Sequence, residues 1–214
     1  MDPTCLSYHL LRPTNVGAGD IPLLGEAYRC WSEVWTQTFA ELDDADSLAS
    51  DDFTRQSEIA ALFHEWECVG TTSLRFIDVS NAIFRDDSYF NVWPEQVLAA
   101  ASAHGPRICI ASSFTVSPRW RRARGARIRD VLGALAVERF LRSDADALIG
   151  TVRNDVGMNA FTYKLGCHAL ARKLTLHGVD VDLIVFFRHS SARPPLEAIA
   201  EGIVQALRPF RGAP

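Results

Sequence analysis

The chain lacks the features of membrane and exported proteins. No stretch approaches the roughly 18 consecutive apolar residues that a membrane span needs. Its first residues, Met1 to Thr4, contain no basic segment followed by an apolar one, which would mark a secretory signal. We therefore expect a cytoplasmic protein that does not bind a membrane.

Cysteine is scarce and scattered. There are five cysteines, with no C-x-x-C pair and no histidine spacing suited to zinc. We interpret them as small buried apolar side chains and expect no metal centre and no catalytic thiol. They are Cys5, Cys30, Cys68, Cys109 and Cys167.

The chain also lacks an excess of positive charge, since 26 acidic residues outnumber 22 basic ones and the net charge is -4. A duplex nucleic acid is therefore an unsuitable partner. The composition shows no sign of disorder: 48% of the 214 residues are hydrophobic and 22% are charged. With no internal repeat and no linker, residues 1–214 are expected to form one domain.

Hydrophobic periodicity predicts strands and helices along the chain. An acidic loop at 43–52 is expected to be mobile, and 79–92 has no clear period. A tight turn near Glu67 should join two antiparallel strands. Strands are expected at 7–12, 58–66, 68–78, 108–116, 145–152, 169–176 and 181–187, and helices at 24–42, 94–104, 128–140, 156–165 and 194–207.

The most informative segment begins with the apolar strand at 108–116 and ends in an arginine-rich turn. Six arginines lie between Arg119 and Arg129, just before the helix at 128–140. A helix start supplies backbone N–H donors and guanidinium groups add bidentate ones, so this turn favours a phosphate ligand. The alternative is a merely solvated helix start.

Two motifs extend this interpretation. Val116-Ser117-Pro118 closes the strand, and the turn after it fits either Arg121-x-x-Arg124-x-Ala126 or Arg122-x-x-Gly125-x-Arg127. Downstream, residues 154–167 contain Asn154, Asn159 and Tyr163-Lys164-Leu165-Gly166-Cys167. Together these motifs resemble the GNAT superfamily of N-acyltransferases, in which a V-x-P-like segment precedes a pyrophosphate-binding turn and an Asn…Tyr-x-(Lys/Arg)-x-Gly-Phe segment follows.

The resemblance implies an α/β (α+β) class protein with the GNAT fold, in which helices flank a central mixed, mostly antiparallel sheet of about seven strands. It also implies that acyl-CoA is the donor substrate. The implied donor-binding residues are Phe114, Val116, Arg121, Arg122, Arg124, Gly125, Ala126, Arg127, Asn154 and Asn159.

The resemblance further implies that Tyr163 protonates or hydrogen-bonds the leaving sulfur; the alternative is a packed aromatic side chain. The strand at 108–116 offers no carboxylate as a general base. We name His64, on the predicted strand at 58–66, as the candidate general base. Ser113, on the strand at 108–116, is a further candidate catalytic residue. Asp78, His168 or a chain of water molecules are alternatives for the base.

A weaker resemblance is to the autoinducer-synthase and long-chain N-acyl amino acid synthase branch. It depends on Asp51-Asp52-Phe53, Val69-Gly70 with Leu74-Arg75-Phe76, Val92-Trp93-Pro94-Glu95, and residues 113–118. The usual Glu-x-x-Arg is absent and Ser113 stands at its arginine position, which argues against homoserine-lactone chemistry. Trp31 and Trp35 could form a wall of an acyl pocket or simply pack in the core.

From the sequence we expect an N-acyltransferase that moves an acyl group from acyl-CoA to a primary amine of a small metabolite. One alternative donor is the phosphopantetheine of an acyl carrier protein. A non-catalytic acyl-thioester-binding protein and a protein-modifying acetyltransferase are further alternatives. The chain is expected to be a monomer or a homodimer.

Overall fold

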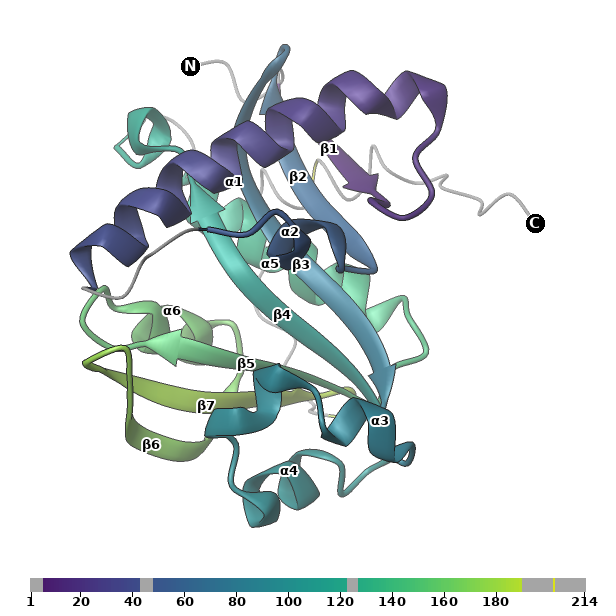
Figure 1. Cartoon of the computed structure of the whole chain (residues 1–214), viewed down its shortest axis with the longest axis vertical. Helices are drawn as coiled ribbons and strands as arrows, with labels where there is room; N and C mark the ends of the chain where they lie inside the picture. The colour runs from purple at the N-terminus through teal and green to yellow at the C-terminus, as the bar shows by residue number, and fades with distance from the viewer. Residues whose placement is uncertain (1–5, 43–47, 123–126, 190–201, 203–214) are drawn as a thin grey trace.

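The structure, a computed structural model, describes residues 6–42, 48–122, 127–189 and 202 (Figure 1). Most predicted elements lie within a few residues of their expected bounds. The predicted loop at 43–52 is wrong at its end, because Asp51–Thr54 is a short helix, and its residues 43–47 lie outside the described ones. The predicted helix at 194–207 also lies outside the described residues, except for Gly202.

The strands are β1 (Leu6–Leu11), β2 (Glu58–His64), β3 (Glu67–Asp78), β4 (Arg107–Val116), β5 (Ala147–Arg153), β6 (His168–Leu176) and β7 (Val179–Phe187). The helices are α1 (Ile21–Glu41), α2 (Asp51–Thr54), α3 (Ala82–Arg85), α4 (Glu95–Ala101), α5 (Ile128–Leu141) and α6 (Met158–Lys164), with 3-10 turns at Ala18–Asp20, Ser88–Val92 and Pro118–Trp120.

The strands form one seven-stranded sheet in the order β1-β2-β3-β4-β5-β7-β6. Every neighbouring pair is antiparallel except β4 and β5, which are parallel. This confirms the predicted mixed, mostly antiparallel sheet. Figure 1 shows α1 in front of the sheet and α5 behind it. We call these sides the α1 face and the α5 face.

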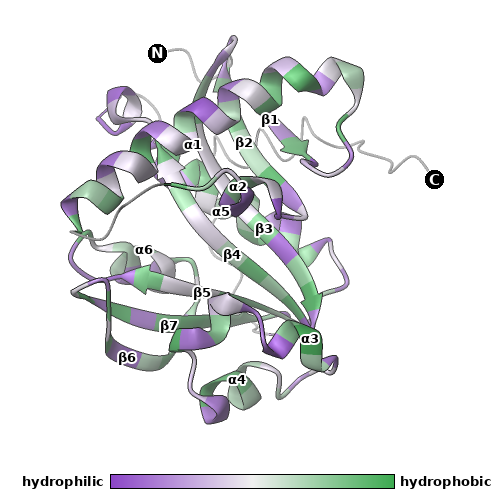
Figure 2. Ribbon diagram, in the orientation of Figure 1, coloured by the Kyte–Doolittle hydropathy of each residue, from purple (hydrophilic) through white to green (hydrophobic). Residues whose placement is uncertain are grey.

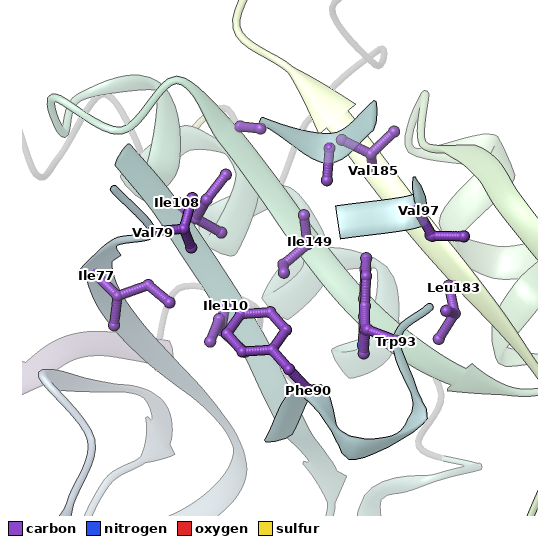
Figure 3. Packing of buried hydrophobic residues seen from close by; sticks show 12 residues of the cluster. Ile77, Val79, Phe90, Trp93, Val97, Ile108, Ile110, Ile149, Leu183 and Val185 are labelled. Atoms are coloured by element: carbon purple, nitrogen blue, oxygen red, sulfur yellow. The ribbon is translucent and has the colours of Figure 1, made fainter. Parts of the chain in front are cut away.

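The alternation of side chains along β2 explains how both faces are covered. Ile59 and Phe63 pack in the cluster formed with α1, whereas Leu62 packs with α5. Both faces of β2 are therefore apolar, and Figure 2 shows hydrophobic residues along the central strands. Farther along the α1 face, Phe90 and Trp93 cover β4 and β5 (Figure 3).

The ladder between β4 and β5 is short. It joins only Ile108–Ile110 to Ala147–Ile149, although β4 continues to Val116 and β5 to Arg153. Beyond Ile110, β4 keeps its pairing with β3, while β5 pairs with β7 along its whole length. The two strands therefore diverge, as Figure 1 shows.

A β-bulge accompanies this divergence. Thr71 pairs with Thr115 but Ser73 pairs with Ser112, so β4 has one more residue than β3 between these pairs. Ser113 in the bulge has a φ of 52°. Nearby, a Cβ on Gly70 would lie 2.8 Å from the Thr115 carbonyl oxygen, so the close approach of β3 to β4 requires glycine there.

A buried ion pair joins α5 to the sheet. Arg139 donates two hydrogen bonds to Glu58, at 2.7 and 2.9 Å, and the Glu58 side chain is only 5% exposed. The Tyr8 hydroxyl is buried beside this pair, and its burial raises the pKa of Tyr8. Arg139 therefore provides most of the attraction that compensates for the desolvation of the Glu58 carboxylate.

We expect Arg139→Met to lower the free energy of unfolding by about 3 kcal/mol, because the Glu58 charge would stay buried with only the longer contact to Arg12, at 3.5 Å. Urea unfolding followed by circular dichroism measures this. The matched control is Arg142→Met, which removes an exposed i,i+4 pair with Glu138 and should cost less than about 1 kcal/mol. Equal losses in both variants would contradict this assignment.

Candidate active site

A cavity of about 660 Å³ lies where β4 and β5 diverge. It is lined from the α1 face by Val34, Trp35, Thr38 and Glu41 of α1, and from the α5 face by residues of α5 and α6. Because lining residues come from both faces, the cavity passes through the gap in the sheet.

The bulge forms one wall of this cavity, at Ser112, Ser113, Phe114 and Val116 of β4. The Ser113 carbonyl accepts a 2.8 Å hydrogen bond from the Thr115 hydroxyl, which accepts a 3.0 Å hydrogen bond from the Trp35 indole N–H. A bulge takes backbone groups out of the ladder. The wall can thus present a backbone N–H donor to a ligand.

Guanidinium groups line the opening beside the start of α5. Arg121, Arg127 and Arg129 border the cavity, and Arg121 Nε donates to the Val116 carbonyl at 3.2 Å. Asp130 is the one carboxylate among them, 3.7 Å from Arg127 and 3.5 Å from Arg129. The described part of this opening is therefore net positive and suited to an anion.

The other arginines of the predicted turn have different positions. Arg122 is exposed and does not line the cavity. Arg119 pairs with Glu67 at 3.1 Å. Arg124, Gly125 and Ala126 lie outside the described residues, so their predicted roles stay predictions. Arg129 was not among the predicted site residues, although the sequence places it inside the same arginine cluster.

Tyr163 does not line the cavity. Its hydroxyl donates a 2.5 Å hydrogen bond to Asp182 of β7, and it is Thr162 that borders the cavity. Two residues separate Tyr163 from Gly166, whereas the resembled motif has three. Successive residues of an α-helix are rotated by about 100° around its axis, so this offset of one residue turns the Tyr163 side chain away from the cavity. Its catalytic role stays a prediction that this geometry does not support.

Asn154 and Asn159, predicted to bind the donor, also donate to Asp182, at 2.9 and 3.5 Å, and do not line the cavity. The backbone N–H of Lys173 is a further donor, at 2.9 Å. Burial alone would raise the pKa of Asp182, but these hydrogen bonds hold that pKa below its ordinary value. Burial, and after it the hydrogen bond and the negative charge of Asp182, raise the pKa of Tyr163 to about 12. The group is thus a structural network that joins α6 to β6 and β7.

The three candidate bases lie outside the cavity lining. His64 packs against Trp120, with 4.9 Å between ring centroids. Asp78 accepts hydrogen bonds from Ser80, and His168 is exposed at the start of β6.

Two carboxylates that the sequence analysis missed do line the cavity: Glu41 and Asp130. Val34, Thr38 and Glu41 follow one another at intervals of four and three residues, so they lie on the same side of α1, beside Trp35. That helical spacing was the available signal for finding it.

The structure decides the alternative left open for the two tryptophans and tests the interpretation of the cysteines. Trp31 is 1% exposed and packs in the core, whereas Trp35 lines the cavity. Cys30, Cys68, Cys109 and Cys167 are buried and form no disulfide, which confirms that these four are buried side chains, and Cys167 also borders the cavity. Cys5 lies outside the described residues.

Within the described ranges, no group of three or more His, Cys, Asp or Glu side chains could hold a metal ion. In the same ranges, no helix is both long and apolar enough to cross a bilayer.

Comparison with known proteins identifies the fold. No family model matches the sequence, and no curated protein matches it. Among solved structures, FeeM, an N-acyl amino acid synthase from uncultured soil microbes, is 13% identical, with a TM-score of 0.58 over 86% of this chain and 91% of FeeM. The acyl-homoserine-lactone (AHL) synthase LasI is 15% identical, with a TM-score of 0.60 over 92% of this chain and 95% of LasI.

BjaI, a CoA-dependent acyl-homoserine lactone synthase, is 13% identical, with a TM-score of 0.61 over 93% of this chain and 90% of BjaI. The neighbours are N-acyltransferases with the GNAT fold. The chain has this fold, which confirms the fold predicted from its motifs.

We expect Tyr163→Phe to lower the free energy of unfolding by about 1 kcal/mol at pH 7, because Asp182 loses a donor to its charged form. The pKa of Asp182 should rise toward its ordinary value in the variant. The destabilisation should therefore be largest above that ordinary pKa and shrink as the pH falls through the lowered pKa of the wild-type protein.

Urea unfolding at pH 7 and at about pH 3 measures this difference. Tyr28→Phe is the control, since no hydrogen bond to the Tyr28 hydroxyl is found among the described residues, and it should change stability little at either pH. A loss for Tyr163→Phe that is the same at both pH values would contradict the role of Asp182.

Proposed function

We propose that the chain is an N-acyltransferase that moves an acyl group from an acyl-CoA thioester to a primary amine of a small metabolite. The observation that carries this proposal is one continuous cavity between β4 and β5. It combines guanidinium groups, a bulged backbone wall and a buried apolar interior. The GNAT fold of the chain supports it further.

The arginine-lined opening suits the phosphates of the donor. Arg121, Arg127 and Arg129 offer several N–H donors, and the carboxylate of Asp130 balances only part of their charge. From this opening a phosphopantetheine arm would run between β4 and β5 and bring its thioester to the bulge. Backbone donors at the bulge would then polarise the carbonyl oxygen.

The reaction needs a neutral amine. Its nitrogen attacks the thioester carbonyl carbon, a C–N bond forms, and the C–S bond breaks. The sulfur leaves as a thiolate that takes up a proton, and one proton of the original ammonium goes to solvent or to a base. The Tyr163 hydroxyl is not assigned to this step, because it is bound to Asp182 outside the cavity lining.

The interior of the cavity suits an acyl chain longer than acetyl. On the α5 face it is bordered by buried apolar side chains, none more than 6% exposed. These residues are Ala136, Val137, Leu148, Cys167 and Ile184. An apolar chain entering here would be removed from water, which contributes about 0.8 kcal/mol for each buried CH₂ group.

An acyl carrier protein is the alternative donor. Arg122 is exposed beside the arginine-lined opening and does not line the cavity. An exposed guanidinium group there suits an acidic protein partner that presents phosphopantetheine. Comparing the same acyl group on CoA and on a carrier protein separates the two donors.

A non-catalytic acyl-thioester-binding protein is the competing function. It is favoured by the absence of a carboxylate from β4 and by the engagement of Tyr163 with Asp182. Binding of acyl-CoA without loss of thioester, across a panel of amines, would favour this alternative.

We expect the double variant Arg121→Ala, Arg127→Ala to raise the KM for the donor by about 10- to 100-fold with a smaller change in kcat. Phosphate contacts of the ground state persist in the transition state, so their loss acts mainly on binding. Steady-state kinetics with a thiol-detecting reagent measures both constants.

Arg122→Ala is the matched control, because this arginine belongs to the same turn but does not line the cavity. It should leave the KM within about threefold of the wild-type value. An unchanged KM in the double variant would argue against donor binding at this opening.

We expect Cys167→Phe to lower kcat/KM for octanoyl-CoA at least about tenfold relative to acetyl-CoA, because the larger ring would fill the apolar interior. Cys167→Ala, the matched variant, should keep the wild-type preference. The ratio of the two donors is the measured quantity, so a general loss of folded protein cancels. A ratio that does not change in Cys167→Phe would rule out this interior as the acyl site.

A further inference from the structure

Within the described residues, the peptide that joins Ser113 to Phe114 lies outside both ladders of β4. The register with β3 passes from Thr115 directly to Ser112, and the ladder with β5 ends at Ile110. Ser113 and Phe114 both line the cavity. The orientation of this peptide is therefore not fixed by strand pairing, and other groups have to hold it.

Two hydrogen bonds in series connect this peptide to α1. The Trp35 indole N–H donates to the Thr115 hydroxyl at 3.0 Å, and that hydroxyl donates to the Ser113 carbonyl at 2.8 Å. An indole N–H can only donate, so the Thr115 oxygen accepts from Trp35 and its own hydrogen is directed to the carbonyl. Thr115 is fully buried, so water does not compete for these bonds.

Holding the carbonyl also holds the N–H at the other end of the same peptide. Peptide units in the described ranges are trans, so the C=O and N–H of each one point in opposite directions. The Ser113 carbonyl is turned toward Thr115, and the Phe114 N–H is therefore turned away from it. Ser113 has a φ of 52°, which residues other than glycine seldom adopt, so this arrangement needs an external support.

Resting on the proposed function, we infer that Thr115 and Trp35 are positioning residues for acyl transfer. Through the Ser113 carbonyl they hold the Phe114 N–H toward the cavity, where the carbonyl oxygen of the thioester accepts from it. This N–H stabilises the negative charge that develops on the oxygen as the amine attacks. Because the donor is already oriented before the reaction, Thr115 and Trp35 act on kcat more than on binding of the donor substrate.

The first test is spectroscopic and needs no turnover. Octanoyl-CoA labelled with ¹³C at its thioester carbonyl is bound in the absence of an amine, and infrared difference spectra give the carbonyl stretching frequency. A hydrogen bond from the Phe114 N–H lowers this frequency. The frequency should rise in Thr115→Val, which removes the hydroxyl at similar volume, and stay at the wild-type value in Thr115→Ser, which keeps it. Equal frequencies in the wild-type protein and Thr115→Val would overturn the inference.

The second test is kinetic and uses the amines that the wild-type protein acylates. Thr115→Val should lower kcat at least about tenfold with the donor KM within about threefold of the wild-type value, and Thr115→Ser should restore most of the loss. Trp35→Phe should also lower kcat, but it should add little in the Thr115→Val background, because both side chains act through one series of hydrogen bonds.

Trp93→Phe is the matched control for Trp35→Phe. The Trp93 indole also donates to a threonine hydroxyl, that of Thr151 at 3.1 Å, but Thr151 lies on β5 and its ladder with β7 has no bulge. This variant should keep kcat within about twofold of the wild-type value.

The outcomes separate this inference from the proposed function. Additive losses of kcat from Trp35→Phe and Thr115→Val, or a change in KM alone, would overturn the positioning role and leave the acyltransferase proposal intact. No transfer by the wild-type protein to any amine would contradict the proposed function, whereas a carbonyl frequency that depends on the Thr115 hydroxyl would still support the role of the peptide. Failure to bind octanoyl-CoA would contradict both.

Discussion

The parting of β4 from β5 after Ile110 is the constraint on which the site depends. β4 cannot keep full ladders with β3 and β5 once the bulge bends it, so its pairing continues with β3 alone. β5 is held by β7 along its whole length and cannot follow. The gap is thus a consequence of how each strand is paired on its other side.

A gap in a sheet leaves backbone groups without ladder partners, which is unfavourable unless other groups bind them. Side chains around the bulge meet part of this need. Thr115 donates to the Ser113 carbonyl and accepts from Trp35. The Arg121 guanidinium binds the Val116 carbonyl. Groups still unpaired at the gap are then available to a ligand, so the local instability of the sheet and its capacity to bind have the same origin.

Much of the fold could be predicted from the sequence because its signals are local. Apolar periodicity defined the strands and α1, and Val116-Ser117-Pro118 identified the end of β4. The site was harder to predict because it depends on which side of an element a residue faces. Tyr163 differs from Thr162 by one helical position, yet only Thr162 reaches the cavity. Asp182, the partner that holds Tyr163, lies on a strand far along the chain, and no local pattern indicates it.

Glu41 and Arg153 illustrate the same limit. Neither belongs to a motif, and they share an opening only because α1 crosses the sheet where β5 ends.

The alternation of side chains along β5 determines which residues of this strand line each side of the cavity. Leu148 and Val152 face the apolar interior on the α5 face, while Thr151 and Arg153 lie on the α1 face. A single strand can thus give the cavity an apolar wall on one face of the sheet and a polar wall on the other. A shift of β5 by one residue would exchange the two faces and bring the guanidinium group of Arg153 into the apolar interior, where its desolvation would be unfavourable. The register between β5 and β7 is therefore as important to the proposed chemistry as any side chain that lines the cavity.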